Sequence, residues 1–327
     1  MRNIFTCALA TLLSCCITST ALAVTALPQQ LTLVVPYAPG GAVDVLTRLL
    51  AKHISSDEAI NIVVENKPGA AGTIAAMQVA RSKPDGHTLM MGTTNTHGVN
   101  SFVIPGLKYD PVKDFTPIAD VAENIVILAA NKNFPAKTLS EAVEIIRQSP
   151  GKYSFGSPGI GSVHALAMEQ FARKLGLDIA HAAYKGAGPA MTDAVAGTIP
   201  LVMAGVVPAK PFLESGRIKI LGIANPKDQM FSDLPEIAHT QYFSDIQKDT
   251  SVQSWIGLFA PAGLDPTLAD SLHDAVEKVL KSDAFVKELT PLGMTPNVST
   301  RGAFADKVAQ NVQTWKTVIS SSVPAKQ

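Results

Sequence analysis

The stretch LTLVVPYAPGGAVDVLTRLL, residues 31–50, decides the fold of this chain. Its opening run, Leu31 to Val35, is apolar or β-branched and predicts a buried strand. Prolines and glycines in residues 36–41 end the strand, and apolar residues recur at helical spacing from Val43 onward. A helix that begins just after Gly40 and Gly41 points free backbone N–H groups into the turn, where its dipole favours an anion.

The same pattern often does no more than reverse the chain, and this alternative stands beside the anion site. Asp44 falls in the first turn of the predicted helix, where a carboxylate is ordinarily a cap and need not be catalytic. The turn lacks both the Gly-Lys-Ser/Thr of a Walker loop and the third glycine of a dinucleotide fingerprint. It is therefore not a nucleotide-binding loop.

The first 23 residues have the form of an export signal. Arg2 precedes a run of small and apolar residues, and Ala21-Leu22-Ala23 fits a signal-peptidase site, so we expect cleavage near Ala23 and a periplasmic protein. All 3 cysteines precede that point, which leaves the mature chain without thiols. The alternative is a lipoprotein acylated at Cys15, whose flanking sequence fits less well.

Size and charge exclude several classes of protein. The chain has 327 residues, more than a typical single core, which favours two α/β domains. Lys and Arg number 27 and Asp and Glu also 27, with no basic run, so nucleic acid is not an expected partner. No segment after the signal is apolar enough to predict a membrane span.

Further predicted strands end in small and hydrogen-bonding residues. Residues 60–65 lead into 66–72 (NKPGAAG), and residues 87–91 lead into a polar cluster that contains Thr94, Asn95, Thr96 and His97. Ligands of open α/β sheets gather beyond the carboxyl ends of the strands. We therefore treat these loops as one candidate site.

A second strand, Gly-rich turn and helix follows about 120 residues after the first. It runs from Tyr153 through the turn 157–162 (SPGIGS) into a helix, and a further loop, 184–190 (YKGAGPA), precedes a helix that contains Asp193. The two matching turns predict two domains that face each other across a cleft. Residues 225–251 are polar and aperiodic and predict a long surface connection.

Enzymatic alternatives find little support in the motifs. Ser162 and His164 could serve an exported serine hydrolase, but no Gly-x-Ser-x-Gly elbow is present. The histidines lack metal-binding spacing and no sulfur ligand survives maturation, so we expect no metal, no cofactor and no catalytic residue. What remains is a set of neutral donors that can bind a carboxylate: backbone N–H groups and the side chains of Tyr37, Thr94, Asn95, Thr96, Ser157 and Ser162.

Several phrases, in order from Leu31 to Trp315, resemble the substrate-binding proteins of tripartite tricarboxylate transporters, the Bug family. They are PYAPGGAVDVLTRLLA, VVENKPGAAGTIAAMQVARSKPDGHTLMMG, THGVN, YDPVKDFTPIADVA, SFGSPGIGSVHALAMEQF and YKGAGPAMTDAVAGTI. The resemblance implies an α/β, two-domain type II periplasmic binding protein fold with a ligand cleft between the domains. We expect a signal peptide at 1–23, a discontinuous first domain at 24–127 and 253–327, and a second domain at 128–252.

The family implies capture of a small carboxylate by hinge closure, not catalysis, with the acid held by backbone amides of the two Gly-rich turns. A monomer is expected, with membrane transporter subunits or a sensor-kinase ectodomain as partners. The ligand-binding residues that we predict are Tyr37, Ala38, Pro39, Gly40, Gly41, Asp44, Thr94, Asn95, Thr96, His97, Ser157, Pro158, Gly159, Gly161, Ser162, His164, Tyr184, Gly186 and Asp193.

Overall fold

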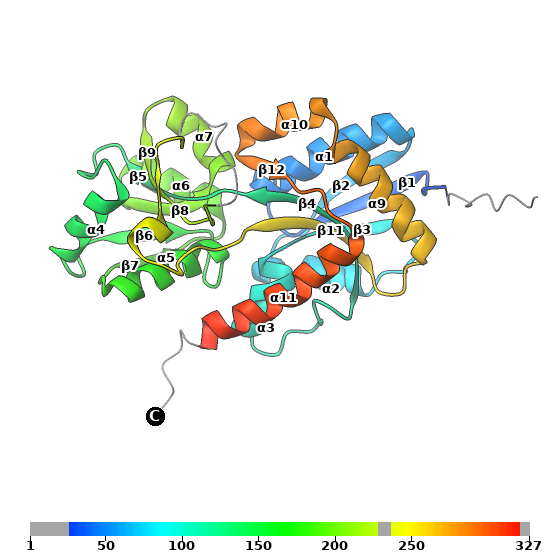
Figure 1. The fold of residues 1–327 in the computed structure, drawn as a ribbon, viewed down its shortest axis with the longest axis horizontal. Coiled ribbons are helices and arrows are strands. Elements are labelled where there is room, and N and C mark those ends of the chain that lie inside the picture. Colours follow the sequence, from blue (N-terminus) through cyan, green and yellow to red (C-terminus); the bar gives the residue numbers. More distant parts are fainter. Residues whose placement is uncertain (1–25, 228–236, 321–327) are drawn as a thin grey trace, which may run out of the picture.

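A computed structural model of the chain describes residues 26–227 and 237–320. The predicted signal peptide, with Cys15, lies outside the described residues. The strands form two sheets (Figure 1). Each sheet, together with the helices that cover it, is called a lobe below.

The first lobe contains the start and the end of the described chain. Its strands are β1 (Gln30–Val35), β2 (Asn61–Asn66), β3 (Thr88–Thr93), β4 (Phe115–Asn124), β11 (Trp255–Pro261) and β12 (Met294–Pro296). Its helices and helical turns are α1 (Ala42–Glu58), η1 (Ala70–Gly72), α2 (Thr73–Ala80), η2 (Asn95–Val99), α3 (Asn100–Val103), α9 (Pro266–Leu280), α10 (Asp283–Leu289), η3 (Thr290–Leu292) and α11 (Arg301–Ser320).

The second lobe is made from the middle of the chain. Its strands are β5 (Val126–Asn131), β6 (Ser154–Ser157), β7 (Ala180–Ala183), β8 (Leu201–Gly205), β9 (Ile218–Ile223) and β10 (Gln241–Tyr242). Its helices are α4 (Leu139–Arg147), α5 (Val163–Leu175), α6 (Ala187–Ala196), α7 (Val206–Glu214) and α8 (Phe243–Ile246).

Each sheet is covered by helices on both faces, which confirms the predicted α/β class. The strand orders are β12-β4-β11-β3-β1-β2 and β10-β9-β5-β8-β6-β7. Strand β1 explains the layers: Leu31, Leu33 and Val35 pack on the face covered by α1 and α9, while Val34 packs on the opposite face. A strand buried on both sides reads as a continuous apolar run, which is why the opening stretch does not alternate.

The lobes are joined where the chain crosses from one sheet to the other. It passes from β4 into β5 between Asn124 and Val126, and it returns into β11 at Trp255 (Figure 1). The domain boundary expected at 127/128 falls inside β5, because Val126 and Ile127 already pair with β8. The crossing segments are bonded to each other: Asn124 N donates to Ser254 O at 2.8 Å.

Asn225 fastens the crossing segments from the inside. Its side chain is fully buried, its Oδ1 accepts from Val126 N at 2.7 Å, and its Nδ2 donates to Asn124 O at 3.1 Å. The side-chain amide of Asn225 thus satisfies a backbone donor, Val126 N, and a backbone acceptor, Asn124 O, on either side of the crossing from β4 to β5. Backbone groups buried at such a point need a partner, because an unmade hydrogen bond there is costly.

The long C-terminal helix α11 is anchored on β4 by charge. Lys307 Nζ lies 2.7 Å from Asp120 Oδ2 and 2.7 Å from Glu123 Oε1. Burial raises the pKa of Asp120 to about 6, against the opposing effect of Lys307. Further along the helix, Trp315 packs in the core cluster that includes Val99 and Val126, so α11 reaches the crossing region.

The expectation of a plain surface connection over 225–251 is wrong for the residues that are described. Gln241 and Tyr242 pair with β9, and Phe243 is fully buried with its ring stacked on Phe171 at 4.2 Å. Phe243 and Ile237 are buried in the cores of this lobe, and apolar residues so few and so far apart produce no periodic pattern. Residues 228–236 of the segment lie outside the described residues.

We expect Asn225→Leu to lower the free energy of unfolding by about 2–3 kcal/mol, because it strands a buried N–H and a buried C=O. Urea unfolding followed by circular dichroism measures this loss. Asn133→Leu is the matched control, since the Asn133 side chain is exposed, and it should change stability by less than about 0.5 kcal/mol. Equal stability of the two variants would show that Asn225 does not fasten the crossing.

Candidate functional site

Strand register places the predicted site loops at one boundary, between the two sheets. In the first lobe Thr93 at the end of β3 pairs with Ile256, next to the crossing at Trp255. In the second lobe Gly205 at the end of β8 pairs with Val126, next to the crossing at Asn124. Strands β1 and β2 are parallel to β3, and β6 and β7 are parallel to β8. The carboxyl ends of all these strands therefore face the opposite lobe.

The first turn, residues 36–41, leaves the N-terminus of α1 open at this boundary. Helix α1 starts at Ala42 without a side-chain cap, and Val45 N is the first amide that bonds back, to Gly41 O at 3.0 Å. Ala38, Pro39 and Gly40 are exposed, and Gly41 is half-buried. The free N–H groups of the first helical turn and the helix dipole make this a suitable place for an anion.

Asp44 stabilises the turn 36–41 by hydrogen bonds and leaves the N–H groups at the start of α1 free. Its carboxylate accepts from Gly40 N at 2.9 Å, from Asn66 Nδ2 at 2.9 Å and from Arg48 Nε at 3.1 Å. Burial alone would raise the pKa of Asp44, but the hydrogen bonds from Arg48, Gly40 and Asn66 outweigh it and lower the pKa below its ordinary value. Asp44, predicted as a ligand residue, therefore serves the shape of the turn.

The second turn, residues 157–162, is bonded more completely than the first. Ser157 is buried, and its Oγ lies 3.2 Å from Gly159 N and 2.6 Å from His181 Nε2. The other ring nitrogen of His181 lies 2.9 Å from Glu169 Oε1. A chain of polar groups from α5 through β7 thus holds the turn, and neither His181 nor Glu169 carries a sequence motif that would have predicted it.

Asn95 of the first lobe caps α5 of the second lobe. Its Nδ2 donates to Gly161 O at 2.8 Å, and its Oδ1 accepts from Val163 N at 3.1 Å. Ser162 Oγ accepts from Ala165 N at 3.1 Å as the N-cap. The two turns are therefore not equivalent, because protein groups take several of the first amides of α5 that the sequence suggested for the ligand.

Two tyrosines predicted for the site are bonded at the boundary. Tyr37 and Thr93 share a hydrogen bond between their hydroxyls at 3.1 Å, and burial raises the pKa of Tyr37. Tyr184 donates to Asp193 Oδ2 at 2.7 Å, and burial together with that carboxylate raises the pKa of Tyr184 to about 12. Gly186, with φ of 132°, begins the turn into α6 beside Tyr184. Pro158 and Gly159 are half-buried in the second turn.

Thr94, Thr96 and His97 differ from the expectation, because their side chains are buried inside the first lobe. Thr94 Oγ1 accepts from Trp255 N at 3.0 Å, and Thr96 Oγ1 lies 2.9 Å from His97 Nδ1. The His97 ring is stacked on Phe259 at 3.8 Å, and burial lowers its pKa to about 3. The polar cluster that reads as a loop is the helical turn η2, which packs on the aromatic core.

The residues of the hydrolase alternative do not form a catalytic pair. Ser162 Oγ is the cap of α5, as described above. His164 Nε2 is buried and has no hydrogen-bond partner among the described residues, and burial lowers the pKa of His164 to about 4. A general base must reach the proton that it removes, and no serine hydroxyl in the described part of the chain bonds His164 Nε2.

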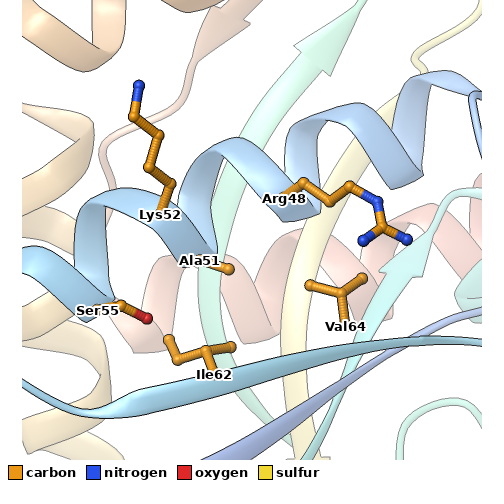
Figure 2. A pocket seen from close by; sticks show the side chains of 6 residues that line it. All are labelled: Arg48, Ala51, Lys52, Ser55, Ile62 and Val64. Atoms are coloured by element: carbon orange, nitrogen blue, oxygen red, sulfur yellow. The ribbon is translucent and has the colours of Figure 1, made fainter.

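A hollow lies between α1 and β2 in the first lobe (Figure 2). Its lining is Arg48, Ala51, Lys52, Ser55, Ile62 and Val64. Arg48 bends over Val64, whereas Lys52 points away from β2. Both cations are paired, Arg48 with Asp44 at 3.0 Å and Lys52 with Glu288 at 2.9 Å. The hollow therefore presents no free charge to an anion.

Residues 26–227 and 237–320 contain neither a candidate membrane span nor a cluster of metal-ligating side chains. None of the helices there combines the length and the apolar character that crossing a membrane requires. In the same part of the chain, no three His, Cys, Asp or Glu side chains come together as a possible metal site.

Comparison with known proteins places the sequence in a family. A family model described as the tripartite tricarboxylate transporter family receptor, TctC, matches residues 46–323. This chain belongs to the TctC receptor family. As a TctC protein it is a solute-binding protein, and the predicted resemblance to that family is confirmed.

Solved structures with the same architecture support the TctC assignment. An R. palustris protein solved with adipate is 30% identical, with a TM-score of 0.84 over 90% of this chain and 97% of that chain. MatC from Rhodopseudomonas palustris, solved with bound malate, is 32% identical, with a TM-score of 0.79 over 89% and 98%. The periplasmic binding protein BugD is 26% identical, with a TM-score of 0.81 over 90% and 97%. The two-lobed periplasmic binding protein fold is therefore confirmed.

We expect Asp44→Ala to lower the free energy of unfolding of this TctC protein by about 2 kcal/mol at pH 7, because three donors lose a buried acceptor. The pKa of Asp44 is lowered in the folded state, so its contribution is present above its ordinary pKa and fades as the pH falls below it. Urea unfolding at pH 7 and pH 3 measures the difference. Asp57→Ala, which removes an exposed partner of Lys278, is the control and should cost less than about 1 kcal/mol. A pH-independent effect of Asp44→Ala would contradict this account.

Proposed function

We propose that this TctC protein captures a small organic carboxylate between its lobes, with the acid bound at the open N-terminus of α1. The observation that carries the proposal is the uncapped start of α1 at Ala42, exposed at the boundary of the two sheets. The family, and neighbours solved with adipate and with malate, support a carboxylate as the ligand class.

Binding by main-chain amides needs no buried cation. The guanidinium of Arg48, one turn along α1, is held by Asp44 and Asn66. A hydrogen bond from a neutral N–H to a charged acceptor contributes about 1.5–3 kcal/mol, so two or three of them give useful affinity. Lys185 is exposed beyond the end of β7 and would add long-range attraction rather than a fixed contact.

Hinge closure is the mechanism that we infer for capture. The lobes are linked by the crossing segments at Asn124–Val126 and Trp255, and small rotations there would move the two turns relative to each other. A ligand that touches both lobes favours the closed form by its extra contacts in that form. Moving the closed fraction from about 1% to 99% takes roughly 5.5 kcal/mol of such preference.

We further propose that the protein is exported through its first 23 residues and works in the periplasm as a monomer without catalytic turnover. The signal-like composition of residues 1–23 and the periplasmic neighbours support this location. The closed form would be read by membrane subunits of a tripartite transporter, or by the ectodomain of a sensor kinase. Either partner would recognise the same surface, which forms when the two lobes come together.

The test is Gly41→Val, and the structure makes it a clean one. Gly41 has an ordinary φ of −78°, and a Cβ there would meet nothing nearer than Ala38 O at 3.7 Å, so the fold should tolerate the side chain. The same side chain would stand in front of the free amides of α1. Calorimetry with a carboxylate that stabilises the wild type should show affinity at least tenfold weaker.

Gly302→Val is the matched control, because its position in α11 is also open and lies far along the chain from the turn. It should bind as the wild type does. Wild-type affinity in Gly41→Val would show that the acid is not held at the start of α1. A thermal-shift screen of organic acids comes first, since a ligand of the native state raises the melting temperature.

A further inference from the structure

Two consecutive alanines adopt a backbone conformation that alanine ordinarily avoids. Ala70 has φ of +45° and Ala71 of +55°, and Gly72 N donates to Gly69 O at 2.9 Å. Residues 69–72 therefore form a β-turn with left-handed central residues, a type that normally selects Asn or Gly. Backbone strain of this kind persists only where the surroundings hold it, and it is frequent at ligand sites.

The surroundings of this turn place it beside the proposed carboxylate site. It follows the carboxyl end of β2, which pairs with β1 up to Asn66 opposite Val35. A Cβ on Gly72 would lie 2.8 Å from Thr96 Cγ2 and 3.0 Å from Pro36 Cβ, so the turn presses on the first residue of the turn 36–41. Asn100 Nδ2 donates to Ala71 O at 2.9 Å and completes the support.

The second lobe presents an apolar side chain at the same boundary. Ile160 is 81% exposed, although it lies between Gly159 and Gly161 in a turn held by hydrogen bonds. Gly161 rests on the first lobe, because its carbonyl accepts from Asn95 and a Cβ there would lie 2.9 Å from Val103 Cγ2.

One segment, residues 95–103, thus supports both the strained turn and the turn that carries Ile160. It contacts the strained turn through Thr96 and Asn100, and it contacts the turn of Ile160 through Asn95 and Val103. The two turns belong to different lobes, so their exposed side chains lie on either side of the proposed site.

The exposed side chains that these turns bring to the boundary are apolar. They are Ala38, Pro39, Ala70, Ala71 and Ile160. Lys67, the charged residue before the strained turn, is ion-paired with Glu65 at 2.7 Å. A ligand between such surfaces gains from buried hydrocarbon and would lose a hydroxyl's hydrogen bonds to water without replacement.

We propose that the ligand is a carboxylate with a hydrocarbon body, contacted by the methyl groups of Ala70 and Ala71 from one lobe and by Ile160 from the other. This inference rests on the proposed function and narrows the class of acid. The strained turn fixes the two methyl groups at the boundary, where an unstrained Asn-Gly turn would offer polar or no side chains.

The test compares succinate, adipate and malate by calorimetry. Relative to succinate, adipate adds two methylenes and malate adds one hydroxyl. Each buried methylene is worth about fourfold in affinity, so the wild type should bind adipate roughly 15-fold more tightly than succinate, and malate more weakly. Ile160→Ser and the double variant Ala70→Gly, Ala71→Gly should each reduce the adipate-to-succinate ratio about threefold or more.

Ala59→Gly is the matched control for strain. Ala59 has φ of +52° at the end of α1, and it precedes β2, whose other end carries the strained turn. Glycine at either place relieves the same kind of strain, so both the control and the double variant should melt about 2–4 °C higher than the wild type or unchanged. The control should keep the wild-type ratio of adipate to succinate affinity.

The outcomes separate this inference from the proposed function. Two results would contradict a ligand with a hydrocarbon body: tighter binding of malate than of succinate, or a wild-type affinity ratio in both Ile160→Ser and the double variant. Either result would leave the proposal of carboxylate capture in place. A wild-type protein that binds none of the three acids, nor any acid in the thermal-shift screen, overturns the proposed function and this inference with it.

Discussion

Antiparallel pairing at the crossings is the constraint on which the arrangement of this protein depends. Strand β11 returns from the second lobe and runs against β3, and β5 enters the second lobe and runs against β8. Because the remaining inner strands are parallel to β3 or to β8, every strand-end loop of interest is directed to the boundary. The site loops, which are separated by more than a hundred residues, come together through the direction of two strands.

Charge is distributed so that the first turn, residues 36–41, offers dipoles rather than ions. Arg48 and Asp44 neutralise each other beneath the first turn, and the carboxylate is further held by Gly40 N and Asn66. What remains at the surface is the uncapped start of α1, with N–H groups that need no counter-ion. Preorganised amides stabilise an incoming negative charge without the desolvation that a buried cation would have to undergo.

The sequence predicts the fold well where local signals are strong and the site less well where contacts are distant. The apolar run, the Gly-Gly break and the helical spacing in residues 31–50 give strand, turn and helix as found. Helix starts later in the chain carry local signals of the same kind, because the side chains of Asp265 and Ser282 cap the first turns of α9 and α10. These signals act within a few residues of the elements that they define.

Residues 94–97 show why the site could not be derived in full. Polar letters there suggest a loop that faces ligand, but His97 stacks on Phe259, a partner more than 150 residues away. Asn95 faces the second lobe and caps α5, which no spacing within the first lobe indicates. The function of a polar side chain is set by what packs against it, and here those neighbours come from the other end of the chain.

The cap supplied by Asn95 also gives the two lobes different tasks. Its hydrogen bonds to Gly161 O and Val163 N already satisfy the start of α5 with groups of the protein. The start of α1 has no such partner and keeps its capacity for an anion.

Under the proposed function, the first lobe would hold the acid by its amides, and the second lobe would close over the rest of the molecule. Selectivity for the body of the ligand then belongs to exposed side chains on the turn 69–72 and on the covering turn, whereas affinity for its carboxylate belongs to the backbone of residues 38–44. This separation explains how one fold could bind many carboxylates through the same backbone groups while a few exposed side chains determine which acid is bound.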